Sequence, residues 1–290
     1  MGIGLGFGWV LLGVAIGPVG DDPPKPVPKA EKEREKPLES PPFGEFLVVP
    51  LRVHVVKAEG VPELDCALTD EDVRRVVAKA NGIWRQAGIR WDLEAIVREP
   101  AEAARVAAFR AASDAAKDAP GGVPLRIFRR IAPPRAPDRG GMDVYYIHKF
   151  AVNGVYLGDR LAFVQETAKL RPVEGGIDEP LPRVTAHELG HALNLPHRQD
   201  RTNLLASGTT GTTLNPDEAR IAREAARKTP GVRDPAAIRS AAESAETSGD
   251  RAAARRLWST LAELPGDGAA EAGSRRDALA DPAPAAAPPR

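Results

Sequence analysis

Apolar residues along the chain first predict a strand, a helix and a second strand. Residues 46–57 (FLVVPLRVHVVK) are rich in Val and Leu, as is typical of a strand, and Pro50 within them indicates an irregularity or a sheet edge. Thr69 and the acidic residues after it favour a helix start, so residues 69–87 are predicted to be helical. Apolar residues recur there at helical spacing, namely Val73, Val76, Val77, Ala80, Ile83, Trp84 and Ala87.

Gly88 ends this helix, and residues 89–97 alternate as a strand. The order strand, helix, strand predicts a βαβ unit with parallel strands. Short strands are also expected at residues 143–147 and 161–166, the second just after an Asn153-Gly154 turn. The predicted fold class is α/β, with a mostly parallel twisted sheet backed by the helix at 69–87.

The other helices differ in how much apolar surface they offer. Residues 102–118 are Ala-rich with only Val106 and Phe109 as large apolar residues, which indicates a surface helix or an insertion. Asn215 and Pro216 start a helix that runs to residue 229. Two further helices, residues 235–247 and 250–264, form a hairpin expected to dock on the preceding domain.

Both ends of the chain are expected to lie outside the folded domain. Residues 3–19 are uncharged and apolar, which is typical of a signal peptide or a short membrane anchor, and the two remain alternatives because no cleavage site follows. Residues 21–42 and 265–290 have compositions typical of disorder. The predicted division is 1–20, 21–42, a main folded domain at 43–230, a helical hairpin at 231–264 and a tail at 265–290. The apolar segment at residues 3–19 predicts a secreted or cell-envelope location.

The composition of the chain limits the classes of partner that it is expected to bind. A chain of 290 residues with 42% hydrophobic residues can bury a substantial core. Forty basic and 40 acidic residues give a net charge of zero, which argues against a nucleic-acid footprint. Cys66 is the only cysteine, so no intrachain disulfide forms and a free, inert thiol is expected. A monomer is expected.

Chemistry concentrates in residues 187–197 (HELGHALNLPH). On a helix, His187 and His191 lie one turn apart on the same face, so both imidazoles can bind one metal ion, with Glu188 beside the first. Zn²⁺ favours histidine nitrogen, and three protein ligands leave a fourth position for water. Glu188 can then take the proton of that water. The chain's two other internal histidines, His54 and His148, are predicted to be structural.

A third ligand, His197, requires the helix to end after His191. Asn194 tolerates the left-handed conformation that ends helices, and Pro196 prevents further helix. His197 can therefore turn back toward the metal. The alternative is that the shorter His-Glu-x-x-His pattern occurs here by chance. A third histidine at this offset makes that a poor explanation.

The segment resembles the signature of the metzincin clan of zinc endopeptidases, H-E-x-x-H-x-x-G-x-x-H followed by a methionine-containing turn. The resemblance implies one catalytic Zn²⁺ bound by His187, His191 and His197, Glu188 as general base, and protein or peptide substrates. It also implies that residues 161–166 form the antiparallel edge strand of the cleft. Asn194 replaces the clan's Gly, and Leu205 stands in the Met position, where its similar volume preserves an apolar floor. The alternative is a catalytically inactive metzincin-like surface protein that binds a partner.

Overall fold

The computed structural model describes residues 38–98, 100–116, 123–135 and 139–280. The expected signal or anchor, most of the linker and the last ten residues of the tail lie outside these ranges. Within them, no helix combines the length and the apolar character needed to cross a membrane.

A five-stranded sheet with the order β2-β1-β3-β5-β4 forms the centre of a mixed α/β fold. Strands β1 (Leu47–Val55), β2 (Ile89–Val97), β3 (Met142–Ile147) and β5 (Leu161–Gln165) are parallel to one another. Only β4 (Gly154–Tyr156) is antiparallel. The prediction of a mostly parallel sheet is confirmed.

The prediction that residues 161–166 form the antiparallel edge is wrong. Strand β5 is parallel to β3 and lies inside the sheet, and the edge is the three-residue strand β4. The hairpin turn lies at residues 158–160, where Asp159 and Arg160 adopt positive φ angles of 52° and 61°. Two non-glycine residues in this conformation are uncommon, so the sequence favoured the Asn153-Gly154 turn instead.

Pro50 marks an irregularity but no edge, because β1 pairs with both β2 and β3. The register between β1 and β2 shifts between Leu51 and Arg52, directly after the proline. A missing backbone N–H is tolerated at such a position.

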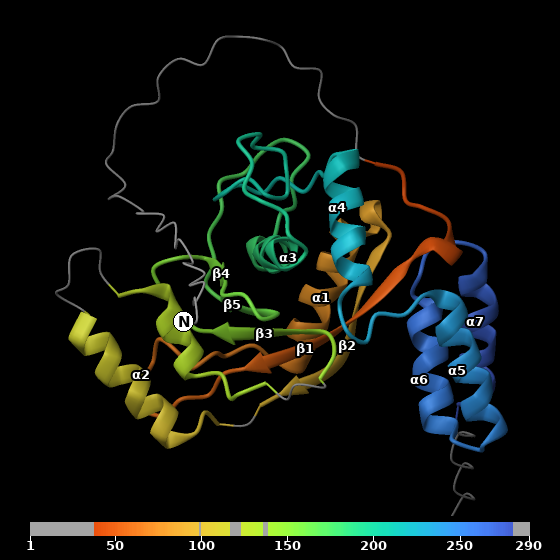
Figure 1. Ribbon diagram of the computed structural model, residues 1–290, viewed down its shortest axis with the longest axis horizontal. Coiled ribbons are helices and arrows are strands. Elements are labelled where there is room, and N and C mark those ends of the chain that lie inside the picture. Colours follow the sequence, from red (N-terminus) through yellow and green to blue (C-terminus); the bar gives the residue numbers. More distant parts are fainter. Residues whose placement is uncertain (1–37, 99, 117–122, 136–138, 281–290) are drawn as a thin grey trace, which may run out of the picture.

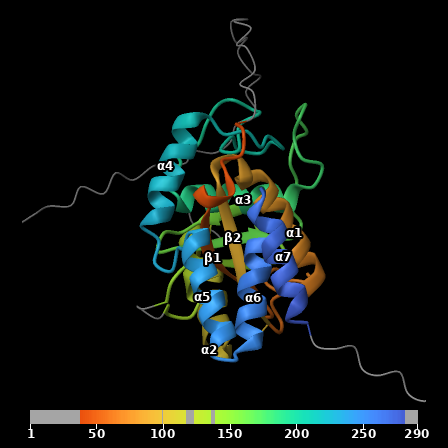
Figure 2. The same cartoon turned by 90° about the vertical axis from the view of Figure 1, so that its right-hand side faces the viewer.

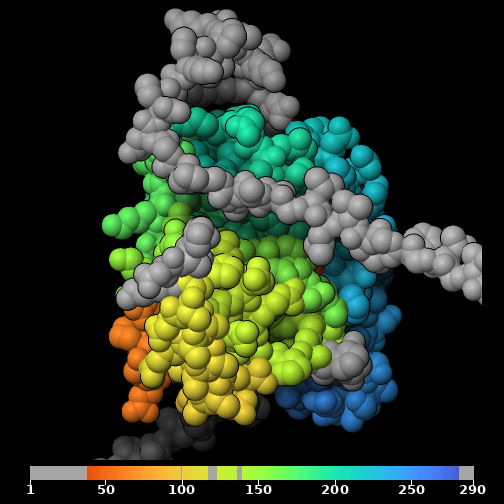
Figure 3. All heavy atoms as spheres, turned by 60° about the vertical axis from the view of Figure 1, so that its left-hand side comes forward, coloured from red at the N-terminus to blue at the C-terminus, as the bar shows by residue number. Residues whose placement is uncertain are grey.

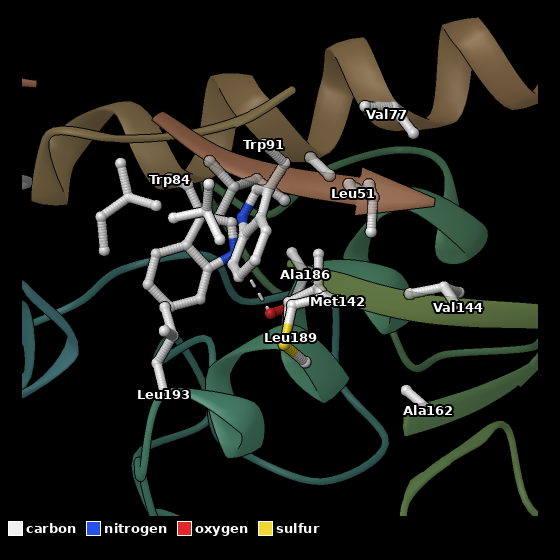
Figure 4. Close-up of a cluster of buried hydrophobic side chains, with 14 of the residues drawn as sticks. Leu51, Val77, Trp84, Trp91, Met142, Val144, Ala162, Ala186, Leu189 and Leu193 are labelled. Atoms are coloured by element: carbon white, nitrogen blue, oxygen red, sulfur yellow. Dashed lines mark hydrogen bonds between the residues drawn. The ribbon is translucent and has the colours of Figure 1, made fainter. Parts of the chain in front are cut away.

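Helix α1 (Asp70–Trp84) begins as predicted, with Thr69 and Asp72 forming a reciprocal capping box. The 3-10 turn η2 (Arg85–Ala87) continues it, and Gly88 ends it in the left-handed conformation at φ 62°. With α3 (Pro180–Ala192), α1 covers one face of the sheet (Figure 1). Figure 4 shows Trp84 between them, its indole N–H donating to the carbonyl of Ala186 at 3.2 Å.

The opposite face of the sheet is covered by α2 (Ala103–Ala116) and the 3-10 helix η3 (Leu125–Arg130). Phe109, Phe128 and Phe163 stack there at centroid distances of 5.6 and 5.1 Å. As expected, α2 is a surface helix, and its residues form an outer surface of the molecule (Figure 3).

The C-terminal region contains one helix more than the sequence predicts. After α4 (Pro216–Arg227), three helices lie side by side (Figure 2), α5 (Pro235–Thr247), α6 (Arg251–Ala262) and α7 (Gly268–Ala278). Helices α5 and α7 contact η1 (Phe43–Glu45), and the three helices share a hydrophobic cluster with Phe46, which follows η1, and with Val48 of β1. The expectation of disorder after residue 264 is therefore wrong for residues 268–278. Helix α7 buries only Ala272. A helix that packs through small side chains shows no stripe of large apolar residues in its sequence, so hydrophobic periodicity does not predict it.

Candidate metal centre

Helix α3 carries His187 and His191 and then reverses the chain. Pro180 occupies its first turn, and the helix ends at Ala192. Asn194 adopts a φ of 65°, so this residue does take the left-handed conformation. The N–H of Leu195 donates to the carbonyl of Gly190 at 3.0 Å, which folds the chain back along the helix. The reversal brings His197 to the first two histidines.

The three imidazoles converge through their Nε2 atoms. His191 Nε2 lies 3.1 Å from His187 Nε2 and 3.0 Å from His197 Nε2. One ligand atom from each residue falls within a group no wider than 4.8 Å. Two nitrogens bound tetrahedrally to zinc at its usual bond length lie about 3.4 Å apart, close to these separations.

Backbone carbonyls determine the tautomers of two of these rings. His187 Nδ1 lies 2.8 Å from the Leu204 oxygen, and His191 Nδ1 lies 2.8 Å from the Leu195 oxygen. Because a carbonyl only accepts, both Nδ1 atoms carry protons when the rings are neutral, and the Nε2 lone pairs face each other. Two lone pairs at this distance repel unless a cation lies between them. The donor set therefore fits a metal ion, and zinc in particular.

Burial keeps the rings of His187 and His191 in the neutral form that binds a metal. Burial lowers the pKa of His187 to about 3, with the nearby Arg183 guanidinium contributing, and also lowers the pKa of His191. His197 is exposed, so the centre is open on one side. An open side is what a site that admits a substrate requires.

Glu188 contacts the sheet edge. Its side chain is buried, and burial raises its pKa to about 8 although the backbone N–H of Tyr156 donates to it. A Cβ added at Gly154 would lie 2.7 Å from Glu188 Oε1, so only glycine permits this approach of β4. The carboxyl group of the residue after His187 thus lies against the antiparallel edge strand.

The turn after the third histidine forms the floor of the centre. Leu205 is fully buried, and a Cβ added at Gly190 would lie 3.2 Å from its Cδ1 atom. Leu205 therefore packs directly beneath the helix that carries His187 and His191. Ser207, two residues later, is exposed, and the turn offers no tyrosine.

Sequence reasoning missed Arg183, a buried residue on α3 one turn before His187. Its guanidinium donates to the carbonyls of Gly211 at 3.0 Å, Asn203 at 3.3 Å and Ala206. Its Nη1 lies 3.2 Å from His187 Nδ1, a contact and no hydrogen bond because that nitrogen donates to Leu204. The sequence signal that could have identified Arg183 is its position, since a charged residue four positions before His187 lies on the buried side of the helix, where charged residues are rare.

Glu218 of α4 holds the same turn from the other side. Its carboxylate accepts from Asn203 Nδ2 at 2.8 Å and from Arg198 Nε at 2.5 Å, and it is fully buried. Asn203 in turn accepts from the N–H of Leu205 at 2.7 Å. The turn is therefore held by two buried charged residues, Arg183 and Glu218, one from each flanking helix.

His54 and His148 do not join the three-histidine group. His54 Nε2 lies 3.1 Å from Asp143 Oδ1, and His148 Nδ1 lies 2.6 Å from Glu166 Oε1. Glu166 also accepts from Cys66 Sγ at 3.3 Å, and the thiol is fully buried.

Comparison with known proteins adds little to this geometry. No family model matches the chain, and no curated protein matches it. The chain is similar to the crystal structure of archaemetzincin from Methanopyrus kandleri, with 13% identity, a TM-score of 0.34, and coverage of 62% of this chain and 96% of that one. The case for a metal centre consequently rests on the residues themselves.

Proposed function

We propose that the chain is a zinc-dependent endopeptidase with His187, His191 and His197 as zinc ligands and Glu188 as general base. The convergence of three Nε2 atoms, two of them fixed as lone-pair donors by backbone carbonyls, carries this proposal. A zinc ion bound there supplies Lewis acidity, which polarises a carbonyl and acidifies water.

The chain's own residues supply proton transfer and positioning. The Glu188 carboxylate accepts a proton from the attacking water and later delivers it to the leaving amine. Burial raises the pKa of this group in the metal-free chain, and the positive charge of a bound cation would lower it again, toward the ionised form that a base requires. The Tyr156 N–H orients the carboxylate toward one side.

The edge strand offers a place for an extended peptide. Leu157 N donates to Leu161 O, and Gln165 N donates to Asn153 O, so these residues of the hairpin face β5. In an antiparallel pair the intervening residues Gly154 and Tyr156 direct their backbone groups away from β5. Glu188 accepts from the Tyr156 N–H, which leaves the Tyr156 carbonyl and the backbone groups of Gly154 for a peptide. A peptide added along this edge would lie beside Glu188. Protein or peptide substrates are proposed on this ground.

The test uses purified full-length protein incubated with an unfolded protein mixture, with and without a zinc chelator, and detects new termini by mass spectrometry. H191A should lose stoichiometric zinc. E188Q should retain zinc and the Tyr156 hydrogen bond yet lose cleavage by at least a hundredfold. E224Q, at an exposed glutamate of α4, is the matched control and should cleave normally.

Two results would contradict the proposal. An active E188Q would mean that another group is the base. A folded, zinc-loaded wild type that cleaves nothing would favour the binding-module alternative. Export to the cell envelope is proposed on residues 3–19 alone and is tested by cell fractionation.

A further inference from the structure

A second polar site lies on the sheet face opposite the histidines. In the pairing of β1 with β3, Arg52 is opposite Asp143 and His54 is opposite Tyr145. Their chain neighbours Val53, Val144 and Tyr146 face the core beneath α1 and α3, so these four residues face the other way. Phe163 of β5 and the apolar side chains of α2 and η3 cover much of that face, so a group of polar residues beside them is a candidate for function.

A cavity of about 410 Å³ opens over these residues, between the sheet and the α2 side of the molecule. Arg52, His54, Arg105, Arg139 and Tyr145 line it. A second cavity of about 420 Å³ adjoins it, shares Arg105, Arg139 and Tyr145, and extends to Arg135 and Asp143. Together they have the size of a small-molecule site.

Positive charge is in excess in the described lining. Arg105 pairs with Glu102 at 2.9 Å, and Arg129 pairs with Asp159 at 2.8 Å. Asp143, only 4% exposed, is shared by Arg139 at 2.5 Å and Arg135. Arg52 has no ion-pair partner among the described residues. The lining therefore holds two guanidinium groups more than carboxylates.

Two guanidinium N–H groups in this region are buried without a partner among the described residues. Arg135 Nε has none in the described structure, and neither has Arg160 Nη1. Burial lowers the pKa of Arg135, and the charges of Arg160 and Arg139 lower it further, against the effect of Asp143. A buried donor without a partner costs about 1–3 kcal/mol, and the negative charge of an anion bound in the cavity would offset part of that cost.

The wall of the cavity is rigid and flat. His54 and Tyr145 stack with centroids 4.1 Å apart and an interplanar angle of 1°, and Tyr145 stacks in turn on Phe163 at 4.9 Å. The His54–Asp143 hydrogen bond fixes the imidazole. Arginines beside such a wall favour a planar or tetrahedral oxyanion, which guanidinium groups bind through paired N–H donors.

We propose that this cavity binds a small organic anion through its carboxylate or phosphate group, with Arg52 and Arg139 as the principal contacts. The site is independent of the histidine centre, since the two lie on opposite faces of the sheet. Nothing in the proposed peptidase chemistry uses it.

Isothermal titration of the full-length protein at low salt tests this proposal with two probes, inorganic phosphate and succinate. At least one should bind saturably with a stoichiometry near one. R52Q and R139Q should each weaken that binding at least tenfold. R74Q is the matched control and should bind normally, because Arg74 is an exposed arginine of α1 whose ion pair in the described part of the chain is with Asp70.

R52Q is the more stringent variant, because Arg52 supports no other described side chain and its loss should leave the thermal unfolding midpoint unchanged. Binding should also persist in H191A, which removes a histidine of the metal centre. Loss of binding in H191A would place the anion on the metal and overturn the proposal. So would unchanged affinity in R52Q, or the absence of saturable binding by both probes.

Discussion

Arg183 shows how one buried charge can organise a metal centre without binding the metal. Burial lowers its pKa to about 10, with the nearby Glu188 opposing the shift, so the side chain stays charged at neutral pH. Its N–H groups donate to three backbone carbonyls within residues 203–211. This segment includes Leu205 and also Leu204, whose carbonyl accepts from His187 Nδ1. Arg183 thereby fixes the group that orients His187.

Replacing Arg183 by methionine should weaken zinc binding by about 10- to 100-fold, the usual cost of losing a partner behind a ligand. Competition with a chromophoric chelator measures this. R220M, at an exposed arginine of α4, is the control. If R183M lowered the stability of the metal-free protein and left zinc affinity unchanged, Arg183 would be a structural residue only.

Cys66 illustrates the opposite case, a reactive residue type made inert. Burial raises the pKa of its thiol to about 12, and the Glu166 carboxylate adds to the shift. At pH 8 the native protein should therefore resist iodoacetamide, whereas protein unfolded in urea should be alkylated completely. Mass spectrometry distinguishes the two. Labelling of native and unfolded protein at similar rates would contradict both the burial and the raised pKa.

At the scale of elements, prediction succeeded where local chemistry dictates the conformation. The Thr69 cap and Gly88 stop of α1, the Asn215 cap of α4 and the left-handed Asn194 are local signals, and each is in the structure. Strand β4 carries no such signal, because three residues show no period and its identity depends on pairing with β5. Arg183 was missed for the same reason, since its carbonyl partners lie up to 28 residues away.

Helix α7 was also missed, and its role can be measured. Trp258 of α6 is fully buried, and Arg275 of α7 lies over its ring at 5.2 Å. A chain ending after residue 264 should uncover part of this indole and lose about 2 kcal/mol of unfolding free energy, from roughly 100 Å² of apolar surface exposed. The surface ion pair between Arg239 and Glu271 should add little.

Urea denaturation and tryptophan emission provide the readouts for this truncation. A chain ending after residue 280 keeps α7 and is the control. Should the shorter chain match it in stability and emission, α7 would contribute nothing to the packing of α6.

At the scale of the whole molecule, the sheet separates two polar centres of different kinds. The histidine centre lies on the α3 side, and the arginine-lined cavities lie on the α2 side. The sequence motif revealed the first because its ligands are close in sequence. The second unites residues from β1, α2 and β3 with residues 135 and 139, which only the folded sheet brings together.

Carboxylates that join distant elements should make the fold sensitive to acid. Burial alone would raise the pKa of Asp143, but the His54 hydrogen bond and the charges of Arg135 and Arg139 hold it below its ordinary 3.8. Glu179, at the start of α3, is likewise held below 4.5 by Arg75 and Lys79 of α1 despite partial burial. A pKa depressed in the folded state stabilises the protein above the unfolded value, and that stabilisation is lost as pH falls through the folded value.

The contribution of Asp143 and Glu179 to the unfolding free energy of the metal-free protein should therefore be constant from pH 7 down to about pH 5. At lower pH that contribution should decrease. Measuring metal-free protein removes the separate effect of histidine protonation on zinc binding. Urea unfolding between pH 7 and pH 3 should show this decline in the wild type and in E224Q. D143N should be less stable than the wild type at pH 7, because Arg135 and Arg139 lose their shared carboxylate, yet should decline less on acidification. If D143N declined as steeply as the wild type, the ion pairs of Asp143 would not contribute to the acid sensitivity.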